Sequence, residues 1–238
     1  MKRVSLTILL TIAITLFLGT FGALRAQEQS APEEGFIPLF NGKNLTGWRY
    51  DSKVWSVEDG LVVGRLTEKI SESTFLICEM PVTNFIIRFD YWISKGGNSG
   101  LQYRSIELPD GTPLRMSGYQ ADFDGEATYS GIIYEERGRG IIGARGNFNS
   151  FVPDSQIIPI EQFADNETIK SAIKIEDWNS YEIIAIGPYL EHRINGVTTT
   201  RAIDLDPAHA KAEGLIGFQC HAGLLMEVKI KNLRIKEL

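Results

Sequence analysis

Short apolar segments that alternate with polar residues, separated by glycine turns, restrict the fold of this chain more than any other feature. In residues 85–91 every second side chain is large and apolar, and the same alternation recurs in residues 119–124 and 216–220. A period of two residues is typical of a β-strand with one buried face. Asp59-Gly60 and Asn195-Gly196 follow or separate such segments, and both pairs are favoured in two-residue hairpin turns. The sequence therefore predicts an all-β protein built as an antiparallel β-sandwich.

Helical signals are few. Residues 159–173 have room for one or two helical turns. Asp206-Pro207 predicts the start of a second short helix, with Asp as the cap and Pro in the first turn. The chain has 238 residues and no internal repeat, which is enough for one substantial core and favours a single domain.

The first 26 residues have the layout of a secretory signal peptide. Lys2 and Arg3 precede a nearly unbroken apolar run from 4 to 18, and small residues lead to Ala26. Cleavage after Ala26 would leave a polar, flexible lead-in at 27–35 and a domain at 36–238, in a secreted or periplasmic protein. The alternative is a retained membrane anchor, because residues 4–24 could almost span a bilayer. No later segment could cross a membrane, so no membrane contact is expected once the signal is removed.

Charge and cysteine content exclude other classes. The formal net charge is −6 and no long run of Lys or Arg follows residue 3, which argues against a nucleic-acid partner. The two cysteines, Cys78 and Cys220, lie in strand-like apolar segments. Buried free thiols are therefore expected, and a disulfide, which export would permit, is the alternative. The sequence has no Cys/His cluster that would indicate a zinc site, and no metal or other cofactor is expected.

Polar side chains that can form hydrogen bonds lie on one face of each of three predicted strands. Alternation places amides, an arginine, carboxylates and a histidine on these faces, namely Asn98, Gln102, Arg104, Gln120, Asp122, Asp124, Gln219 and His221. Such groups suit sugar hydroxyls, which need paired donors and acceptors. A solvated sheet face is the alternative for any single strand. The recurrence on three strands favours a carbohydrate ligand.

Seven segments in a fixed order resemble the 3-keto-disaccharide hydrolase domain family. They are residues 40–48, 55–60, 96–100, 118–124, 178–181, 194–196 and 230–235. The resemblance implies a jelly-roll sandwich of the concanavalin A-like lectin/glucanase type, with a concave sheet as the ligand face. It also implies hydrolysis of sugars already oxidised to a ketone at C3. The chain lacks the E-x-D-x-x-E strand of ordinary endoglucanases on that fold, so a retaining carboxylate pair is not expected.

The implied chemistry assigns roles to the polar residues. A ketone at C3 acidifies the C2 proton, so the reaction needs a base, a donor for the enolate oxygen and an acid for the leaving group. We expect His221, Asp122 and Glu135 to supply the acid and base, with His221 titrating nearest neutrality. The other expected residues bind substrate: Asn98, Gln102, Arg104, Gln120, Arg145 and Gln219. His192 and His209 are expected at the surface.

Several alternatives stay open. Asp122, Asp124 and Glu126 could bind Ca²⁺, because carboxylates at alternate positions often do. The G-x-G-x-x-G sequence at 138–143 is not followed by a helix pattern, so a dinucleotide site is not expected there. A basic loop at the rim of the cleft and a plain glycine-rich hairpin are the two alternatives. A non-catalytic carbohydrate-binding module would need exposed aromatics such as Trp48 or Trp92 in a groove. A structural envelope protein is the third alternative.

Overall fold

The computed structural model of the chain describes residues 33–108 and 114–238. The compact unit is Glu34–Leu238. The expected export signal at 1–26 and most of the lead-in at 27–35 lie outside the described residues. Within the described part, no helix has the length and hydropathy that a membrane span requires.

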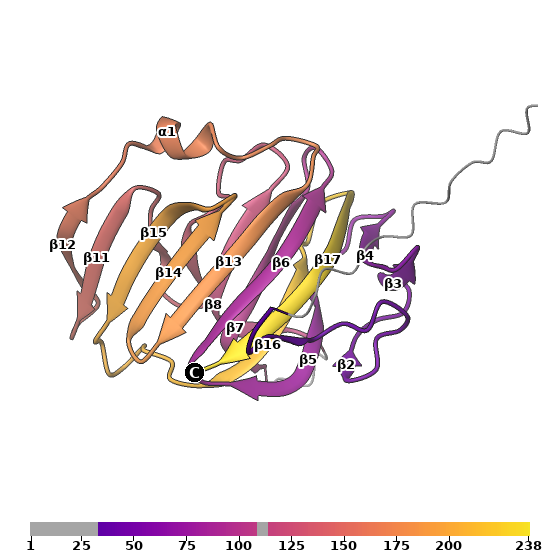
Figure 1. The fold of residues 1–238 in the computed structure, drawn as a ribbon, viewed down its shortest axis with the longest axis horizontal. Coiled ribbons are helices and arrows are strands. Elements are labelled where there is room, and N and C mark those ends of the chain that lie inside the picture. Colours follow the sequence, from indigo (N-terminus) through magenta and orange to yellow (C-terminus); the bar gives the residue numbers. More distant parts are fainter. Residues whose placement is uncertain (1–32, 109–113) are drawn as a thin grey trace, which may run out of the picture. The chain divides into compact units, whose positions relative to one another are not determined.

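Two β-sheets stack face to face (Figure 1). In spatial order the larger sheet, here called sheet A, contains β12 (Gln156–Gln162), β11 (Asn147–Val152), β15 (Val197–Asp204), β14 (Tyr189–Ile194), β13 (Asn179–Ile186), β6 (Phe85–Ile93), β17 (Met226–Glu237), β4 (Leu61–Leu66) and β3 (Trp55–Glu58), with β1 (Ile37–Pro38) also paired to β17. The smaller sheet, sheet B, contains β10 (Gly140–Gly143), β9 (Ile133–Glu136), β8 (Met116–Asp124), β7 (Asn98–Glu107), β16 (Gly214–Cys220), β5 (Thr74–Val82) and β2 (Trp48–Arg49). All pairs are antiparallel except β11 with β15, which confirms the predicted antiparallel sandwich.

Helix is nearly absent from the described residues. The helix α1 (Asn166–Lys170) falls inside the segment that was expected to hold helical turns, and the side chain of Asp165 caps it by accepting from the backbone N–H of Thr168 at 2.8 Å. The prediction that a helix starts at Asp206-Pro207 is wrong. The carbonyl of Asp206 accepts from the N–H groups of His209 and Ala210, which closes one turn, and the chain then enters β16.

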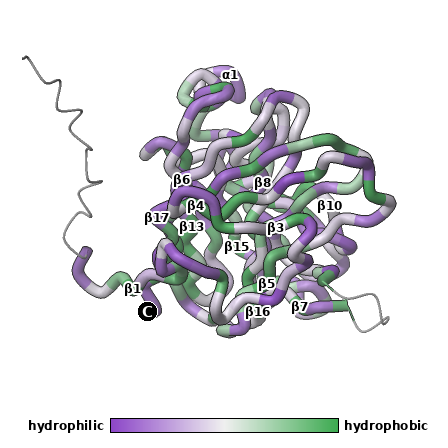
Figure 2. Tube along the Cα trace, turned by 90° about the vertical axis from the view of Figure 1, so that its right-hand side faces the viewer, coloured by the Kyte–Doolittle hydropathy of each residue, from purple (hydrophilic) through white to green (hydrophobic). Residues whose placement is uncertain are grey.

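Aromatic side chains fill the space between the sheets. Phe89 and Tyr181 of sheet A stack with ring centroids 5.4 Å apart, and Tyr91 of sheet A stacks on Phe123 of sheet B at 4.2 Å. These are the residues that alternation assigns to the buried face. Figure 2 shows hydrophobic residues running through the middle of the molecule along strands such as β5, β13 and β15.

The two cysteines are buried free thiols, so the disulfide alternative is wrong. Burial raises the pKa of both thiols, most strongly that of Cys220. Neither is therefore a reactive thiolate near neutral pH.

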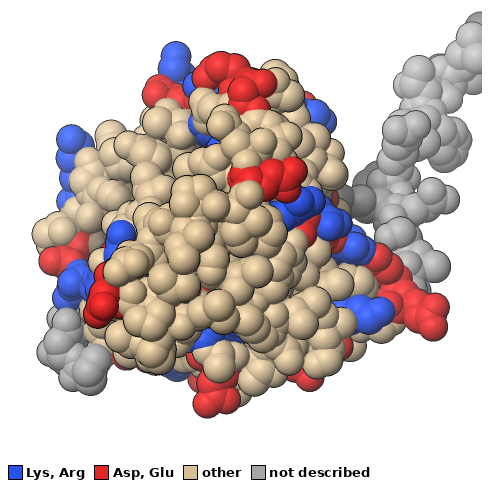
Figure 3. Space-filling view, turned by 90° about the vertical axis from the view of Figure 1, so that its left-hand side faces the viewer, with Lys and Arg blue, Asp and Glu red and all other residues tan. Residues whose placement is uncertain are grey.

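The edge strand β12 is exposed along its whole length. Its isoleucines Ile157, Ile158 and Ile160 are each about half exposed, and Pro159 interrupts the donors of the edge. Figure 3 views the molecule from the side on which β12 lies in Figure 1, and shows a broad uncharged surface with charged groups mostly around its margin.

Candidate active site

A pocket of about 560 Å³ opens on the face of sheet B that points away from the core. Its polar lining consists of Asn98, Gln120, Asp122, Glu136, Gln219 and His221. Its apolar and aromatic lining consists of Tyr129, Ile132, Tyr134, Ile141 and Leu224. A volume of this size, with a few polar groups on an otherwise apolar wall, is typical of small-molecule sites.

Strand register explains why the polar residues meet. Gln120 on β8 lies opposite Gln102 on β7 and opposite Tyr134 on β9, so these three side chains share one face. Asp122 follows two residues later on the same face, opposite Gly100. The intervening Ala121 points into the core.

Six of the expected site residues lie in or directly beside this pocket. Five of them line it, namely Asn98, Gln120, Asp122, Gln219 and His221. Gln102 is fully buried and donates from Nε2 to Gln120 Oε1 at 3.2 Å, so it supports the pocket from beneath.

The expectation that Glu135 faces the cleft is wrong. Glu135 lies opposite Tyr119, whose side chain is in the core, so it points to the other side of sheet B. There it is buried in ion pairs with Arg139 at 2.5 Å and Lys211 at 3.5 Å. The same contacts show that Arg139 is buried and not part of an exposed basic rim.

Arg104 also lies outside the pocket, because a bulge follows Tyr103 and inverts the alternation of β7. Arg104 has a φ of +47°, and its buried guanidinium donates to the carbonyls of Thr83 and Gly187, both at 2.7 Å. Its role is to join turns at one end of the sandwich.

Arg145 is a third residue that the structure places elsewhere. Its guanidinium donates to the carbonyls of Ala127 and Ser130, both at 2.9 Å, and to Asn166 Oδ1 at 2.8 Å. It therefore fixes the loop after β8 from behind and does not meet a ligand in the pocket.

Glu136 is the carboxylate that sequence reasoning missed. It lies opposite Gly118 and lines the pocket, and burial raises its pKa against the lowering effect of Arg137 and His221. A shift of one residue in register moves a side chain to the other face of a strand. The signal that could have found Glu136 was pairing with β8, since Tyr134 and Glu136 then share the face of Gln120.

The carboxyl of Asp122 has a strongly shifted pKa. Burial raises its pKa to about 8, and the nearby carboxylates of Asp124 and Glu136 add to the rise. The side-chain N–H of Gln120, which donates to Asp122 Oδ1, opposes the rise by stabilising the ionised form. The carboxyl is therefore poised to exchange a proton near neutral pH.

The imidazole of His221 is oriented by the backbone. Its Nδ1 lies 2.8 Å from the carbonyl oxygen of Ala222, which can only accept, so Nδ1 carries the hydrogen. In the neutral ring Nε2 then holds the free lone pair. His221 is exposed and can take or give a proton at Nε2.

The carboxylate of Asp124 is committed to the loop that follows β8. Its oxygens accept from the backbone N–H groups of Glu126, Thr128, Tyr129 and Ser130. Among the described residues no group of three or more His, Cys, Asp or Glu side chains is placed to hold a metal ion, so the Ca²⁺ alternative gains no support.

His192 was expected at the surface and is instead fully buried between the sheets. Its Nδ1 donates to the carbonyl of Ile132 at 3.1 Å, and its Nε2 lies 3.0 Å from the hydroxyl of Tyr103. Burial lowers its pKa to about 3. It is a neutral structural residue.

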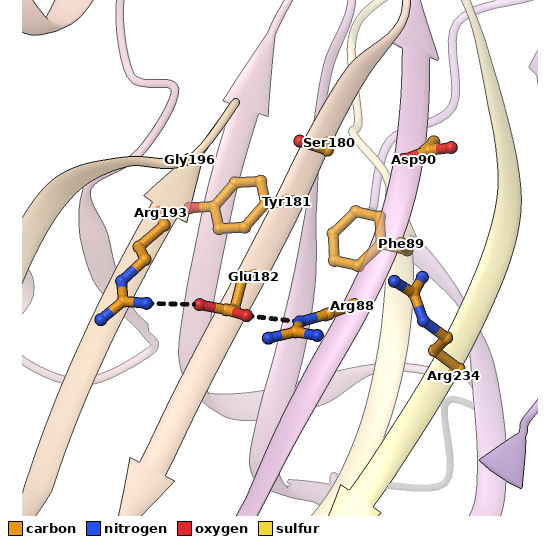
Figure 4. A pocket seen from close by; sticks show the side chains of 9 residues that line it. All are labelled: Arg88, Phe89, Asp90, Ser180, Tyr181, Glu182, Arg193, Gly196 and Arg234. Carbon is orange, nitrogen blue, oxygen red and sulfur yellow. Dashed lines mark hydrogen bonds and ion pairs between the residues drawn. The ribbon is translucent and has the colours of Figure 1, made fainter. Parts of the chain in front are cut away.

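A second hollow, of about 290 Å³, lies on sheet A (Figure 4). Glu182 is ion-paired there with Arg88 and, at 2.9 Å, with Arg193. Its carboxylate is engaged between two guanidiniums. The tryptophans that a binding module would need are not in the sheet B pocket: Trp48 is buried, and Trp92 lies against Lys229 of sheet A.

Comparison with known proteins identifies the family. Residues 35–236 match the model of the 3-keto-alpha-glucoside-1,2-lyase-like domain. The chain belongs to this family. A second match is local. The chain is 32% identical over 84 residues to a 3-keto-disaccharide hydrolase of Bacteroides thetaiotaomicron, and these residues are 32% of this chain and 29% of that protein.

Solved structures show the same fold as this 3-keto-alpha-glucoside-1,2-lyase-like domain. A candidate glycosyl hydrolase of Parabacteroides distasonis ATCC 8503 superposes with a TM-score of 0.57 at 24% identity, covering 86% of this chain and 94% of that one. A Bacillus subtilis protein with a galectin-like fold has the same TM-score at 14% identity, covering 85% and 94%. The lectin-like sandwich implied by the sequence is thereby confirmed.

Proposed function

We propose that this protein cleaves the glycosidic bond of 3-keto-glycosides and acts as a hydrolase. The observation that carries the proposal is the buried carboxyl of Asp122, with a pKa of about 8, in one pocket with His221 and Glu136. Family membership and the name of the Bacteroides relative support the substrate class.

The reaction follows from the acidity that a C3 ketone gives to the C2 proton. Ionised Asp122 removes this proton, and the electron pair forms an enolate whose oxygen is the former ketone oxygen. The enolate collapses, expels the C1 substituent and leaves a C1–C2 double bond conjugated to the ketone. Protonated Glu136 or His221 gives a proton to the departing oxygen. Water then adds at C1 and gives a proton to the group, Glu136 or His221, that protonated the departing oxygen, while C2 regains a proton from Asp122.

The amides of the pocket suit the non-reacting part of the sugar. Asn98 and Gln219 present donors and acceptors for hydroxyls, and Tyr129 and Tyr134 offer ring faces or edges. Release of the elimination product before water adds would make the protein a lyase. Product analysis separates the two outcomes.

The test is incubation of the purified protein with 3-keto-trehalose, 3-keto-lactose and the unoxidised parent sugars. We expect cleavage of the keto forms only, with a bell-shaped pH profile, because the reaction needs both ionised Asp122, whose pKa is about 8, and a protonated acid, Glu136 or His221. Asp122→Asn, Glu136→Gln and His221→Ala should each lower turnover by about 10²-fold, the usual contribution of one acid or base.

Two matched variants control for non-specific damage. Glu126→Gln removes an exposed carboxylate on the loop after β8, and His209→Ala removes a histidine that does not line the pocket. Both should retain turnover. Full activity in Asp122→Asn would refute the assigned base, and sugar binding without cleavage in the unmodified protein would favour a binding module.

We also propose that the protein is exported and that the mature chain starts near Gln27. The basic start, the apolar run and Ala26 support this. N-terminal sequencing of the protein recovered outside the cytoplasm tests it, and a chain that still begins at Met1 would refute cleavage.

A further inference from the structure

Three glutamines lie fully buried beneath or beside the pocket on three adjacent strands. They are Gln102 on β7, Gln120 on β8 and Gln219 on β16, each 2% exposed or less. Burying an amide is costly unless it is hydrogen-bonded. Here the amides bond to one another: Gln102 Nε2 donates to Gln120 Oε1 at 3.2 Å, and Gln120 Nε2 lies 3.4 Å from Gln219 Oε1.

The row ends on the carboxyl of Asp122. Gln120 Nε2 also donates to Asp122 Oδ1, so both acceptors at this end face the amino group of Gln120. An inverted Gln120 amide would place oxygen against oxygen at Asp122 and nitrogen against nitrogen at Gln102. The donor of Gln102 therefore reinforces the amide orientation that serves Asp122 by holding the oxygen of the Gln120 amide on the opposite side.

Gly100 provides the space that this arrangement needs. It lies opposite Asp122, and a Cβ atom built on it would be 2.6 Å from Cγ and 2.8 Å from Nε2 of Gln120. Real Cβ contacts are not this short, so any side chain at position 100 would displace Gln120. Gly100 is the last residue of the segment Gly96–Gly100. The proposed reaction does not otherwise explain why this position is a glycine.

Gln102 keeps one atom unpaired. Among the described residues its Oε1 is buried with no hydrogen-bond partner. A buried unpaired acceptor destabilises the fold, so the presence of Gln102 is not explained by stability. Methionine has a similar length and would remove the unpaired acceptor.

We propose that Gly100, Gln102 and Gln120 are positioning residues that hold the carboxylate of Asp122 in its reactive state: Gly100 leaves room for Gln120, and Gln102 fixes the orientation of its amide. The role that this gives to Asp122 in catalysis rests on the proposed function. The hydrogen-bond row itself does not.

Other groups also act on Asp122 and stay in place in the tests. Asp124 lies on the same strand, Tyr134 and Glu136 on β9, His221 lies just beyond β16, and Tyr181 of β13 approaches from the core side. A change seen after substitution of Gln102 or Gly100 is thus a change in the row.

The experiment is a ¹³C NMR titration of the carboxyl of Asp122 in the full chain, with Asp122→Asn used to assign the signal. In Gln102→Met and in Gly100→Ala the donor to Asp122 is lost or misdirected, so its pKa should rise by about one unit or more. Gln102→Met should unfold at about the same temperature as the unmodified protein. Ser105→Ala, which removes a buried hydroxyl of β7 that bonds to the Tyr103 carbonyl, is the control and should leave the titration unchanged.

An unchanged Asp122 titration in Gln102→Met would overturn the proposal, and a lower unfolding temperature with that unchanged titration would show a structural role alone. The readout does not need turnover. A raised pKa in a protein that cleaves no 3-keto-glycoside would therefore uphold the positioning row and refute the proposed function.

Discussion

At the scale of single residues, the burial of Asp122 links catalysis to stability. A carboxyl whose pKa is raised to about 8 in the fold is protonated there at a pH where the unfolded chain has already lost the proton. The folded state then binds more protons, so the contribution of Asp122 to stability is complete below about pH 4 and is lost as pH rises towards 8. The ionised carboxylate that the proposed reaction needs is therefore the form of Asp122 that destabilises the fold.

Asp122→Asn should remove that dependence. We expect the variant to gain stability relative to the unmodified protein between pH 5 and pH 7.5, by about 3 kcal/mol, because its amide has no proton to lose. Urea unfolding at the two pH values measures the difference. An equal effect of the substitution at both would show that Asp122 ionises normally in the fold.

Sequence alone located part of the site, for reasons visible in individual residues. Gln120, Asp122 and Gln219 lie on the pocket face that alternation predicts for them, because their strands alternate without interruption there. Glu135 was chosen over Glu136 because the glycine-rich turn after β9 gives no register. Arg104 was misplaced because a bulge reverses the alternation and polar character gave no hint of it.

At the scale of elements, Arg104 fixes the end of β7 to both sheets. Its guanidinium donates to the carbonyls of Thr83 and Gly187 and, at 3.2 Å, to Lys211 O and Asn84 Oδ1. These acceptors belong to the turns between β5 and β6, between β13 and β14, and between β15 and β16. One side chain thereby forms hydrogen bonds with three of the turns that connect the strands.

Arg104→Met should therefore destabilise the fold by about 3 kcal/mol, since it keeps the length of the side chain and removes the charge-assisted hydrogen bonds that tie three connections together. Thermal unfolding measures the loss. Arg137→Met is the matched control: its partly exposed guanidinium pairs with Glu72 at 3.2 Å, and such pairs contribute at most about 1 kcal/mol. Similar unfolding temperatures for the two variants would contradict the role given to Arg104.

At the scale of the whole molecule, two buried groups titrate in opposite senses. His192 of β14 joins sheet A to sheet B through the hydroxyl of Tyr103 on β7 and the carbonyl of Ile132 just before β9, and burial lowers its pKa to about 3. The folded state keeps it neutral, so its contribution is complete above about pH 6.5 and is lost as pH falls below that value. Asp122 acts in the reverse direction, and the two partly cancel between pH 5 and 7.5.

Removing Asp122 should expose the titration of His192. Asp122→Asn should lose about 2 kcal/mol of stability from this group when the pH falls from 7.5 to 5, because the unfolded chain gains a proton that the fold excludes. Adding His192→Gln, whose amide can donate to the Ile132 carbonyl and accept from Tyr103, should abolish this loss. The measurement is the free energy of unfolding in urea at pH 5 and at pH 7.5. It is made on the unmodified protein, on both single variants and on the double variant. Equal acid sensitivity with and without His192 would mean that the imidazole is protonated in the fold, and the two sheets would then be joined by a charged residue.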